Sequence, residues 1–252
     1  VAAAYDVAGA AETGAAMALV CVSRARAATQ ALIADAAASL APDGVLVVDG
    51  QKNDGIDPMI RALKQRARVG DPVVKAHGRL VGVQAGADVA DWASHPKQIE
   101  GNFVTRPGVF SADGPDPASV LLAGVLPDKL GSRVVDLGAG WGYLSRAILT
   151  RDNVQRLDLV ETDGVALDCA RENVIDPRAH FHWADATTFR PEIPAHAVVC
   201  NPPFHTTRQA DPGLGAAFIR AAQRMLAAEG VLWLVANRHL PYDPVLAAAF
   251  RE

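Results

Sequence analysis

The stretch that decides the fold reads RVVDLGAGWGYLSRAIL and occupies residues 133–149. Its first five residues are mostly apolar, which is typical of a short buried strand, and a helical pattern begins at Tyr143. Between them, the turn 138–142 carries three glycines, whose lack of a Cβ lets backbone approach a ligand closely. A strand, a glycine-rich turn and a helix start predict an α/β domain with a pocket at the carboxyl end of a parallel strand. The dinucleotide fingerprint would need a glycine where Tyr143 stands, which disfavours NAD.

Two further strands are predicted to end at the same edge of the sheet, each in a carboxylate. Residues 156–160 are predicted to form a strand that ends in Glu161, a helix is predicted over 164–173, and residues 179–186 are predicted to form a strand that ends in Asp185. A glutamate at the first position is placed to accept hydrogen bonds from a ribose diol, and an aspartate at the second from an adenine amine. Taken singly, the first is also compatible with a solvated strand-end residue and the second with a turn cap.

A fourth strand, 197–200, leads into Asn201-Pro202-Pro203-Phe204. The prolines fix φ and lack N–H donors, so their carbonyls can be held outward as acceptors. With the carboxamide oxygen of Asn201 and the flat face of Phe204, the set suits a planar exocyclic amine. Holding both amine hydrogens out of the plane localises the nitrogen lone pair toward an electrophile, and no strong general base is needed because the proton can leave after transfer. The alternative is a rigid turn without a catalytic role.

The chain also contains an internal repeat. Residues 39–63 and 225–249 align without gaps at an offset of 186, with eight identities in 25 positions. Upstream, residues 18–21 resemble residues 197–200 at an offset of 179. We therefore predict two related domains, of which the first has Val22-Ser23-Arg24-Ala25 in place of the tetrapeptide. Chance similarity between alanine-rich αβα units is the alternative.

The first copy continues into residues 73–86, which predict two strands around His77-Gly78. The second copy reaches Glu252 without such a hairpin, so we expect the natural chain to continue by about twenty residues or more. Because the sequence does not start with Met, we also expect the numbering to begin inside a longer chain. Turn-forming residues near 95–105 predict the boundary between the halves.

Composition excludes several classes of protein. Half of the 252 residues are apolar, which supports a packed core. No apolar run reaches the roughly 18 residues of a membrane helix, and the N-terminal stretch lacks the basic segment of a signal peptide. Cys21, Cys169 and Cys200 form no C-x-x-C pair, which favours a reduced, cytoplasmic setting. His180 and His182 share a strand face without a third ligand nearby, so no metal is expected.

The order of these motifs resembles that of class I S-adenosylmethionine methyltransferases that modify an exocyclic amine. The segment before the glycine turn resembles bacterial rRNA guanine-N2 methyltransferases of the RsmC type. It comprises Pro107-Gly108-Val109-Phe110-Ser111, then Gly114, Asp116, Ser119, Leu121 and Leu122. The resemblance covers the whole chain, most strongly 102–242. It implies two tandem doubly wound Rossmann-like methyltransferase domains, a degenerate one over 1–100 and a catalytic one over 101–252.

The resemblance also implies roles for matching residues. The residues implied to bind S-adenosylmethionine are Asp136, Gly138, Ala139, Gly140, Gly142, Glu161, Asp185, Ala186 and Asn201. The residues implied to hold the guanine amine and ring are Asn201, Pro202, Pro203 and Phe204. Phe110 is expected to line the substrate pocket, and Arg208 and Arg238 to contact the flanking phosphates.

The implied substrate is a guanosine of 16S ribosomal RNA in the small subunit, methylated by a cytoplasmic monomer without a metal or a membrane partner. Other amines remain alternatives, namely a 23S rRNA guanine, adenine N6 or a protein glutamine amide, as does a catalytically silent RNA-binding protein. The net charge of −4 excludes a globally basic RNA binder. Residues 61–79, however, carry six basic residues against one acidic residue. This basic segment is the predicted RNA-positioning surface, or alternatively a solvated helix face.

Overall fold

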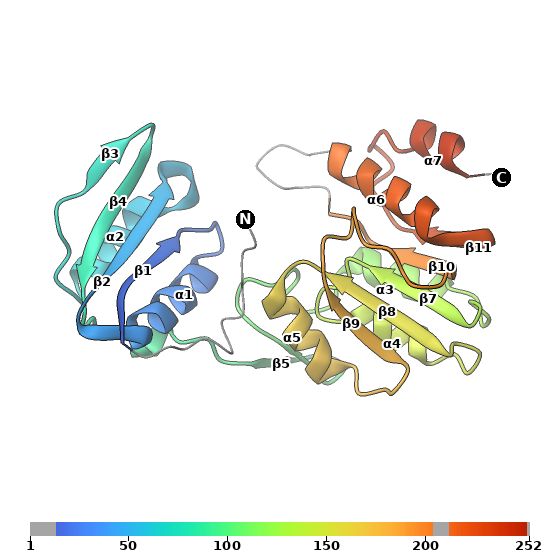
Figure 1. Ribbon diagram of the computed structural model, residues 1–252, viewed down its shortest axis with the longest axis horizontal. Helices are drawn as coiled ribbons and strands as arrows, with labels where there is room; N and C mark the ends of the chain where they lie inside the picture. Colours follow the sequence, from blue (N-terminus) through green and yellow to red (C-terminus); the bar gives the residue numbers. More distant parts are fainter. Residues whose placement is uncertain (1–13, 204–211, 251–252) are drawn as a thin grey trace. The chain divides into compact units, whose positions relative to one another are not determined.

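The computed structural model describes residues 14–203 and 212–250. The chain divides into two compact units (Figure 1). The N-terminal unit runs to Pro96 and includes Arg106–Gly108, whereas the C-terminal unit comprises Lys97–Thr105 and the residues from Val109 onward. Within the described part of the chain, no helix is long and apolar enough to cross a membrane.

The N-terminal unit is a mixed sheet packed against helices. Its elements are β1 (Ala15–Cys21), α1 (Arg26–Ser39), β2 (Leu40–Gln51), η1 (Lys52–Asp54), α2 (Ile56–Lys64), β3 (Val73–Lys75), β4 (Gly78–Gln84) and η2 (Ala90–Trp92). The strand order is β1-β2-β4-β3, with β1 parallel to β2 and the β3–β4 hairpin antiparallel. Side chains along β2 alternate between buried and less buried, because a sheet with one covered face buries every second residue. Leu46 and Val48 therefore pack with Ile33 of α1 and Leu63 of α2.

The C-terminal unit is built on a five-stranded parallel sheet. Its elements are β5 (Lys97–Ile99), β6 (Phe103–Thr105), α3 (Pro117–Val125), β7 (Arg133–Leu137), α4 (Tyr143–Leu149), β8 (Arg156–Glu161), α5 (Gly164–Asn173), β9 (Ala179–Trp183), β10 (Ala195–Cys200), α6 (Pro212–Met225), β11 (Leu226–Leu234) and α7 (Asp243–Ala249). The strand order is β11-β10-β7-β8-β9, and β5 pairs with β6 in a separate antiparallel ribbon. The strands predicted at 133–137 and 156–161 and the helix at 164–173 are confirmed.

Helices cover both faces of this sheet. Val134, Leu157 and Val199 share one cluster with side chains of α3, α4 and α5. Val135 and Val198 point to the other face and pack against α6. This doubly wound arrangement has its switch point between β7 and β10, where the strand order reverses, and ligands of such sheets bind at the carboxyl ends of the strands there.

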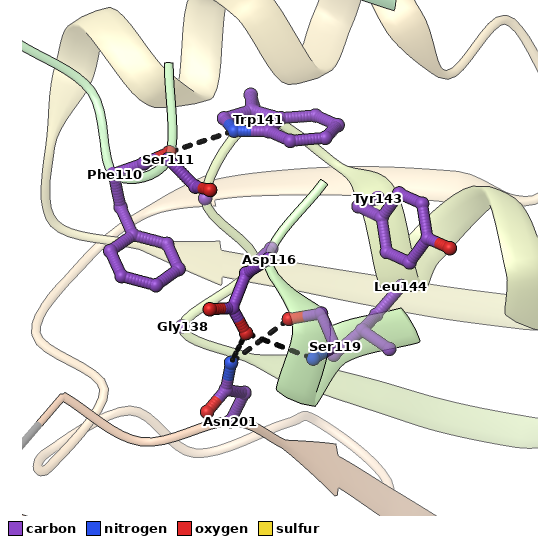
Figure 2. A pocket seen from close by; sticks show the side chains of 11 residues that line it. Phe110, Ser111, Asp116, Ser119, Gly138, Trp141, Tyr143, Leu144 and Asn201 are labelled. Atoms are coloured by element: carbon purple, nitrogen blue, oxygen red, sulfur yellow. Dashed lines mark hydrogen bonds between the residues drawn. The ribbon is translucent and has the colours of Figure 1, made fainter. Parts of the chain in front are cut away.

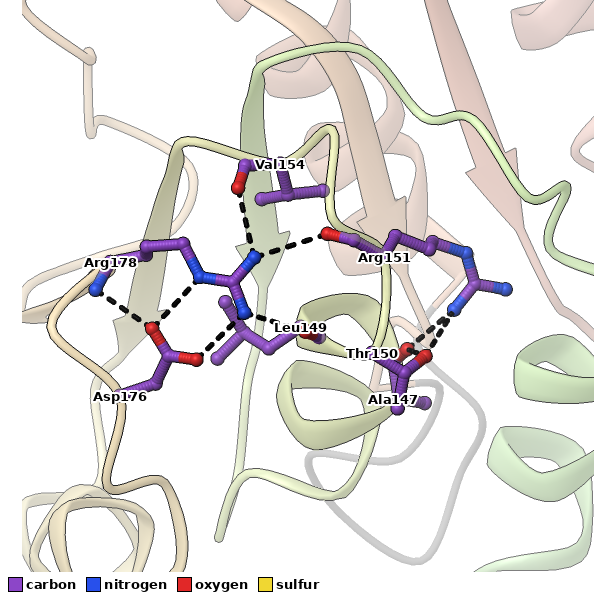
Figure 3. A network of polar contacts seen from close by, with 7 residues as sticks. All are labelled: Ala147, Leu149, Thr150, Arg151, Val154, Asp176 and Arg178. Atoms are coloured by element: carbon purple, nitrogen blue, oxygen red, sulfur yellow. Dashed lines mark hydrogen bonds and ion pairs between the residues drawn. The ribbon is translucent and has the colours of Figure 1, made fainter.

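Two arginines fasten the end of the helix that follows the glycine turn (Figure 3). Arg178 donates to the carbonyl oxygens of Leu149, Arg151 and Val154 at 2.6–3.1 Å and pairs with Asp176 at 2.7 Å. Arg151 donates to the carbonyls of three further residues, Leu126, Pro127 and Ala147. Because the last carbonyls of a helix have no partners within it, these guanidinium groups satisfy them and hold α4 against the sheet.

The repeated segments adopt the same β-α-β-α order in both units. In each, two parallel strands pair with an irregularity at the same place, after Ala15 in β1 and after Ala195 in β10. A glycine at the repeat offset sits at each irregularity, where an added Cβ would lie 2.8 Å from the Ala15 carbonyl at Gly44 and 2.9 Å from the Ala195 carbonyl at Gly230. In both strand pairs, the absence of a Cβ at this glycine therefore allows the two backbones to come close together at the irregularity.

The strand register corrects the predicted alignment upstream of the repeat. Val45 pairs with Met17, and Val231, its counterpart at offset 186, pairs with Ala197. Met17 and Ala197 are thus equivalent at an offset of 180 rather than 179, and Cys21 stands where Asn201 stands. The sequence could not resolve this one-residue shift, because backbone pairing rather than apolar composition fixes the register.

The hairpin over 73–86 is confirmed, but its turn lies one residue earlier than predicted. Ala76 and His77 occupy the turn with φ of 47° and 62°, and Lys75 pairs with Gly78. Two consecutive left-handed residues match the twist of an antiparallel pair. Asn-Gly is the usual sequence for such a turn, so Ala76-His77 gave no local signal.

Candidate functional site

The backbone of the glycine turn after β7 adopts left-handed φ angles, which residues with a Cβ rarely adopt. Gly138, Gly140 and Gly142 have φ of +80°, +55° and +91°. A Cβ on Gly142 would lie 2.8 Å from Cγ2 of Val174, whereas a Cβ on Gly140 would meet open space. Gly142 is therefore needed for packing of the turn, and Gly140 leaves room where a ligand can approach the backbone.

Glu161, at the end of β8, closes the turn from the neighbouring strand. Its carboxylate accepts hydrogen bonds from the backbone N–H of Gly140 at 2.8 Å, of Thr162 at 2.7 Å and of Asp163 at 2.8 Å. Burial raises the pKa of this carboxyl, and the three hydrogen bonds oppose that rise. The side chain thus fixes the shape of the turn, and Oε2, which accepts only the Gly140 N–H, keeps a lone pair for a further donor.

Asp136 lies within β7, wholly buried between the sheet and α4. The Ser145 hydroxyl donates to Oδ2 at 2.5 Å, whereas Oδ1 is buried without a hydrogen-bond partner. Burial raises the pKa of Asp136 to about 7, and the negative charge of Glu161 adds to the rise. A half-satisfied buried carboxylate two residues before the glycine turn favours a positively charged group nearby.

A pocket of about 390 Å³ of empty space, partly open to solvent, lies at the switch point (Figure 2). One wall is the glycine turn with the start of α4, namely Gly138, Ala139, Gly140, Trp141, Tyr143 and Leu144. The opposite wall is the segment before and within α3, namely Phe110, Ser111, Asp116 and Ser119. Asn201, the first residue after β10, completes the pocket. The glycine turn and Asn201, the first residue of the Asn-Pro-Pro sequence, therefore meet in one pocket.

Asn201 is held in one orientation by α3. Its side-chain amide nitrogen donates to Oδ2 of Asp116 at 3.0 Å and to the Ser119 hydroxyl at 2.9 Å. Asp116 is the N-cap of α3, and the same Oδ2 accepts the Ser119 backbone N–H at 2.9 Å. Both amide hydrogens of Asn201 are used in this way, so its carboxamide oxygen is the atom that remains to accept a hydrogen bond.

The loop that carries Phe110 is pinned to the glycine turn. The indole N–H of Trp141 donates to the Phe110 carbonyl at 2.8 Å. Ser111 adopts a left-handed conformation with φ of 53°, and its hydroxyl donates to the Gly114 carbonyl at 2.7 Å. The Phe110 side chain is 60% exposed although its residue lines the pocket. An exposed aromatic ring on a fixed loop can stack on a ligand that enters the pocket.

Sequence reasoning missed the role of Asn173, the last residue of α5. This buried side chain accepts the Val104 N–H at 2.6 Å and donates to the carbonyls of Val104 and Trp141 at 2.8 Å each. Phe103, Trp141 and Tyr143 pack edge to face or tilted around the same place. Asn173 therefore ties the β6 strand to the glycine turn. Its partners lie 32 and 69 residues away, so no local signal could have identified it.

The structure brings together only part of the predicted site. Phe110, Gly138, Ala139, Gly140 and Asn201 line the pocket, and Glu161 contacts its floor through Gly140. Pro202 is buried directly after Asn201, whereas Pro203 is exposed. Phe204 and Arg208 lie outside the described residues.

Asp185, Ala186 and Arg238 do not line this pocket. β9 ends at Trp183, two residues before Asp185. The Asp185 side chain accepts the backbone N–H and the hydroxyl of Thr187, both at 2.7 Å, as a turn cap does. Asp185 and Arg238 are exposed, and Ala186 is buried. Among the residues that the structure describes, no three His, Cys, Asp or Glu side chains are grouped to hold a metal.

A parallel sheet in this order, with a glycine turn after its central strand and a carboxylate after the next, defines an α/β domain of the nucleoside-cofactor class. Residues 100–252 match the family model described as the methyltransferase small domain, and the chain belongs to that family.

Two curated relatives show which kind of methyltransferase the chain is similar to. The chain is 32% identical over 222 residues to the ribosomal RNA small subunit methyltransferase C of Salmonella gallinarum, covering 84% of this chain and 64% of that protein. It is 27% identical over 228 residues to the protein of the same name from Shewanella sp., covering 86% and 65%. The chain thus spans about two thirds of the length of these relatives.

A solved structure extends the similarity to nearly the whole chain. The T. thermophilus 16S rRNA N2 G1207 methyltransferase (RsmC), determined in complex with AdoMet and guanosine, superposes with a TM-score of 0.78 at 26% identity. It covers 95% of this chain and 69% of its own. The predicted resemblance to RsmC-type methyltransferases is confirmed.

Proposed function

We propose that this chain carries the catalytic unit of an S-adenosylmethionine-dependent methyltransferase that modifies the exocyclic N2 amine of a guanosine in 16S ribosomal RNA. The observation that carries the proposal is the meeting of the glycine turn and Asn201 in one pocket. The turn supplies backbone for a nucleoside cofactor, and the Asn-Pro-Pro sequence supplies acceptors for an amine.

The residues present fit this cofactor. S-adenosylmethionine carries a ribose diol and two positive charges, one of them on a sulfonium that supplies an electrophilic methyl group. Oε2 of Glu161 has one lone pair left for a hydroxyl of the diol, and the open space at Gly140 admits a ligand against the backbone. The unpartnered Oδ1 of Asp136 supports a cationic ligand, since it leaves a buried negative charge uncompensated. Asp185 and Ala186 remain the proposed adenine contacts.

The chain's own residues would then prepare the nucleophile. The Asn201 carboxamide oxygen and the Pro202 carbonyl accept the two hydrogens of the guanine amine, which draws the nitrogen lone pair out of conjugation with the ring. Phe110, and Phe204 beyond Pro203, provide aromatic faces for the base. No general base is required, because the proton is lost after the methyl group has been transferred and the nitrogen is positively charged.

The substrate assignment rests on the relatives. Two curated relatives are named for methylation of small-subunit ribosomal RNA, and the structural relative was determined with guanosine. We extend that substrate to this chain and propose that it works in the cytoplasm as a monomer. Extrusion of the target base from its stack would cost a few kcal/mol, roughly, which binding to a structured ribosomal particle offsets.

We propose that the N-terminal unit is a degenerate copy of the catalytic one and positions the RNA. The shared element order, strand irregularity and close-approach glycines support the duplication. Cys21, at the position of Asn201, lacks the carboxamide. The basic segment 61–79 is the proposed RNA-positioning surface, although two of its cations are engaged: Arg66 pairs with Asp91 and Arg79 with Asp57. Reversing the charge of the four others should weaken RNA binding without altering cofactor binding.

The test is methylation of ribosomal subunits that lack the modification. The protein is incubated with small and large subunits and labelled S-adenosylmethionine, and the labelled nucleoside is identified by mass spectrometry. N2-methylguanosine in the small subunit is expected, and the Asn201→Ala variant should lose about 10²–10³-fold in turnover. Label in adenosine, in the large subunit or only in protein would overturn the substrate, and full turnover by Asn201→Ala would overturn the mechanism.

A further inference from the structure

We propose that Asp116 is a positioning residue that sets the orientation of the Asn201 carboxamide, so that its oxygen and not its NH₂ group faces the substrate amine. The proposal rests on the function proposed above and adds to it the residue that selects an amine as ligand. Asp116, Ser119 and Asn201 line one pocket and are joined by the hydrogen bonds seen in Figure 2.

The first step is the chemical asymmetry of an amide. Rotating an asparagine side chain by 180° about its last bond exchanges an acceptor oxygen for a two-hydrogen donor at nearly the same position. With the oxygen toward the pocket, Asn201 accepts from an amine; with NH₂ toward the pocket, it would repel one. The two orientations therefore have opposite preferences for a substrate, and something must choose between them.

Asp116 makes that choice. A carboxylate accepts hydrogen bonds and has none to donate, so only the NH₂ end of Asn201 can lie 3.0 Å from its Oδ2. The Ser119 hydroxyl, 2.9 Å away, takes the second amide hydrogen. The opposite orientation would set the amide oxygen against a carboxylate oxygen, and a neutral residue at position 116 would remove that penalty.

The helix fixes Asp116 in turn. Its Oδ2 accepts the Ser119 backbone N–H at 2.9 Å as the N-cap of α3, and Pro117 follows at the first helical position. Ser119 is buried. One oxygen thus joins the start of α3 to the residue after β10, 85 positions further along the chain. This double role also suggests how to separate capping from orientation experimentally.

The Asp116→Ser variant separates the two roles. Serine caps a helix about as well as aspartate, but its shorter side chain cannot reach Asn201. We expect kcat for small-subunit RNA to fall about 10–100-fold, with the Kd for S-adenosylmethionine and the KM for RNA changed less than threefold. The matched control is Asp113→Ser, the same change at a side chain that is 94% exposed and pairs with Lys97, and it should retain wild-type kcat. An Asp116→Ser variant with wild-type kcat would overturn the proposal.

A second pair of variants excludes a merely structural role. Asn201→Asp places two carboxylates side by side, and we expect almost no turnover. Adding Asp116→Asn restores a donor–acceptor pair of reversed polarity, so the double variant should exceed Asn201→Asp at least tenfold. If Asp116 only supported the fold, the double variant would be no better than the single one. A wild-type protein that labels no guanosine would instead refute the proposed function, an outcome distinct from an active wild type with an equally active Asp116→Ser.

Discussion

Replacing the buried Asp136 with asparagine should remove most of the pH dependence that this residue imposes on stability. Asp136 is fully buried, and its pKa is raised from 3.8 to about 7, first by burial and then by the charge of Glu161. The folded protein therefore holds a proton at pH 5 that the unfolded chain has mostly released. A group whose pKa is raised on folding stabilises the folded state at low pH, and that contribution is lost as the pH rises toward 7.

The magnitude follows from the two pKa values. Each unit of pKa difference is worth about 1.4 kcal/mol, so ionised Asp136 costs the folded state about 4 kcal/mol at pH 8. At pH 5, where the folded group is protonated, the cost is only about 1.7 kcal/mol. The free energy of unfolding of the wild type should thus fall by about 2.5 kcal/mol between pH 5 and pH 8, relative to Asp136→Asn.

Urea unfolding followed by circular dichroism at several pH values measures this difference. The comparison between the two proteins cancels titrations that they share. An asparagine amide at this position would leave one buried hydrogen-bonding group unsatisfied, as Oδ1 is now. Any resulting difference in the free energy of unfolding would be the same at every pH, so it would not change the slope that the comparison measures. Parallel stability profiles for the wild type and Asp136→Asn would refute the assigned ionisation of Asp136.

The proposed cofactor adds a second measurement. A cationic ligand binds best when Asp136 is ionised, a fraction that drops from about 90% at pH 8 to about 10% at pH 6 for a pKa near 7. The affinity for S-adenosylmethionine, measured by calorimetry, should therefore weaken about tenfold over this range in the wild type. Asp136→Asn should bind more weakly than the wild type at pH 8 and show a nearly flat profile. An equally steep profile in the variant would show that another group controls the affinity.

Five further substitutions test other parts of the C-terminal unit. Gly142→Ala should cost about 2–4 kcal/mol in unfolding experiments, because its φ is +91° and the new Cβ would lie 2.8 Å from Cγ2 of Val174, the residue after α5. Gly140→Ala should cost about 1 kcal/mol and chiefly weaken cofactor binding. Asn173→Ala should cost about 2–4 kcal/mol by urea unfolding, since it removes the partner of the buried Trp141 carbonyl and of the N–H and carbonyl of half-buried Val104. A loss below about 1 kcal/mol would contradict this. Arg178→Met should lower the melting temperature by an amount equivalent to about 2–3 kcal/mol, whereas Arg171→Met, which breaks an exposed ion pair, should change it little.

The sequence was most informative where structure is local. The strand 133–137, the glycine turn and the helix from Tyr143 follow one another within 17 residues, and each carries its own signal in periodicity or in glycine. The helix Gly164–Asn173 was predictable for the same reason, with Asp163 capping it through the Val165 N–H.

Prediction failed where the determining contact is distant or where the local residue is atypical. The strand predicted over residues 179–186 ends at Trp183, and the Asp185 carboxylate that follows it caps its own turn, while its role as an adenine contact stays a prediction. Similarly, the repeat was evident from Leu40/Leu226 and Gly44/Gly230, but only pairing of β1 with β2 and of β10 with β11 could place Met17 opposite Ala197 in the alignment.

Asn201 illustrates most sharply what a motif leaves open. Its sequence predicts an acceptor after a buried strand, but an asparagine offers acceptor and donor with equal ease, and nothing in Asn201-Pro202-Pro203 decides between them. The decision comes from Asp116, a residue whose own sequence context, aspartate before proline at a helix start, indicates only an N-cap. The carboxylate serves both functions through one oxygen, so a capping signal conceals an orienting one. In such a site, specificity for an amine depends on both Asn201 and Asp116, which the fold brings together. The sequence motif contains only Asn201.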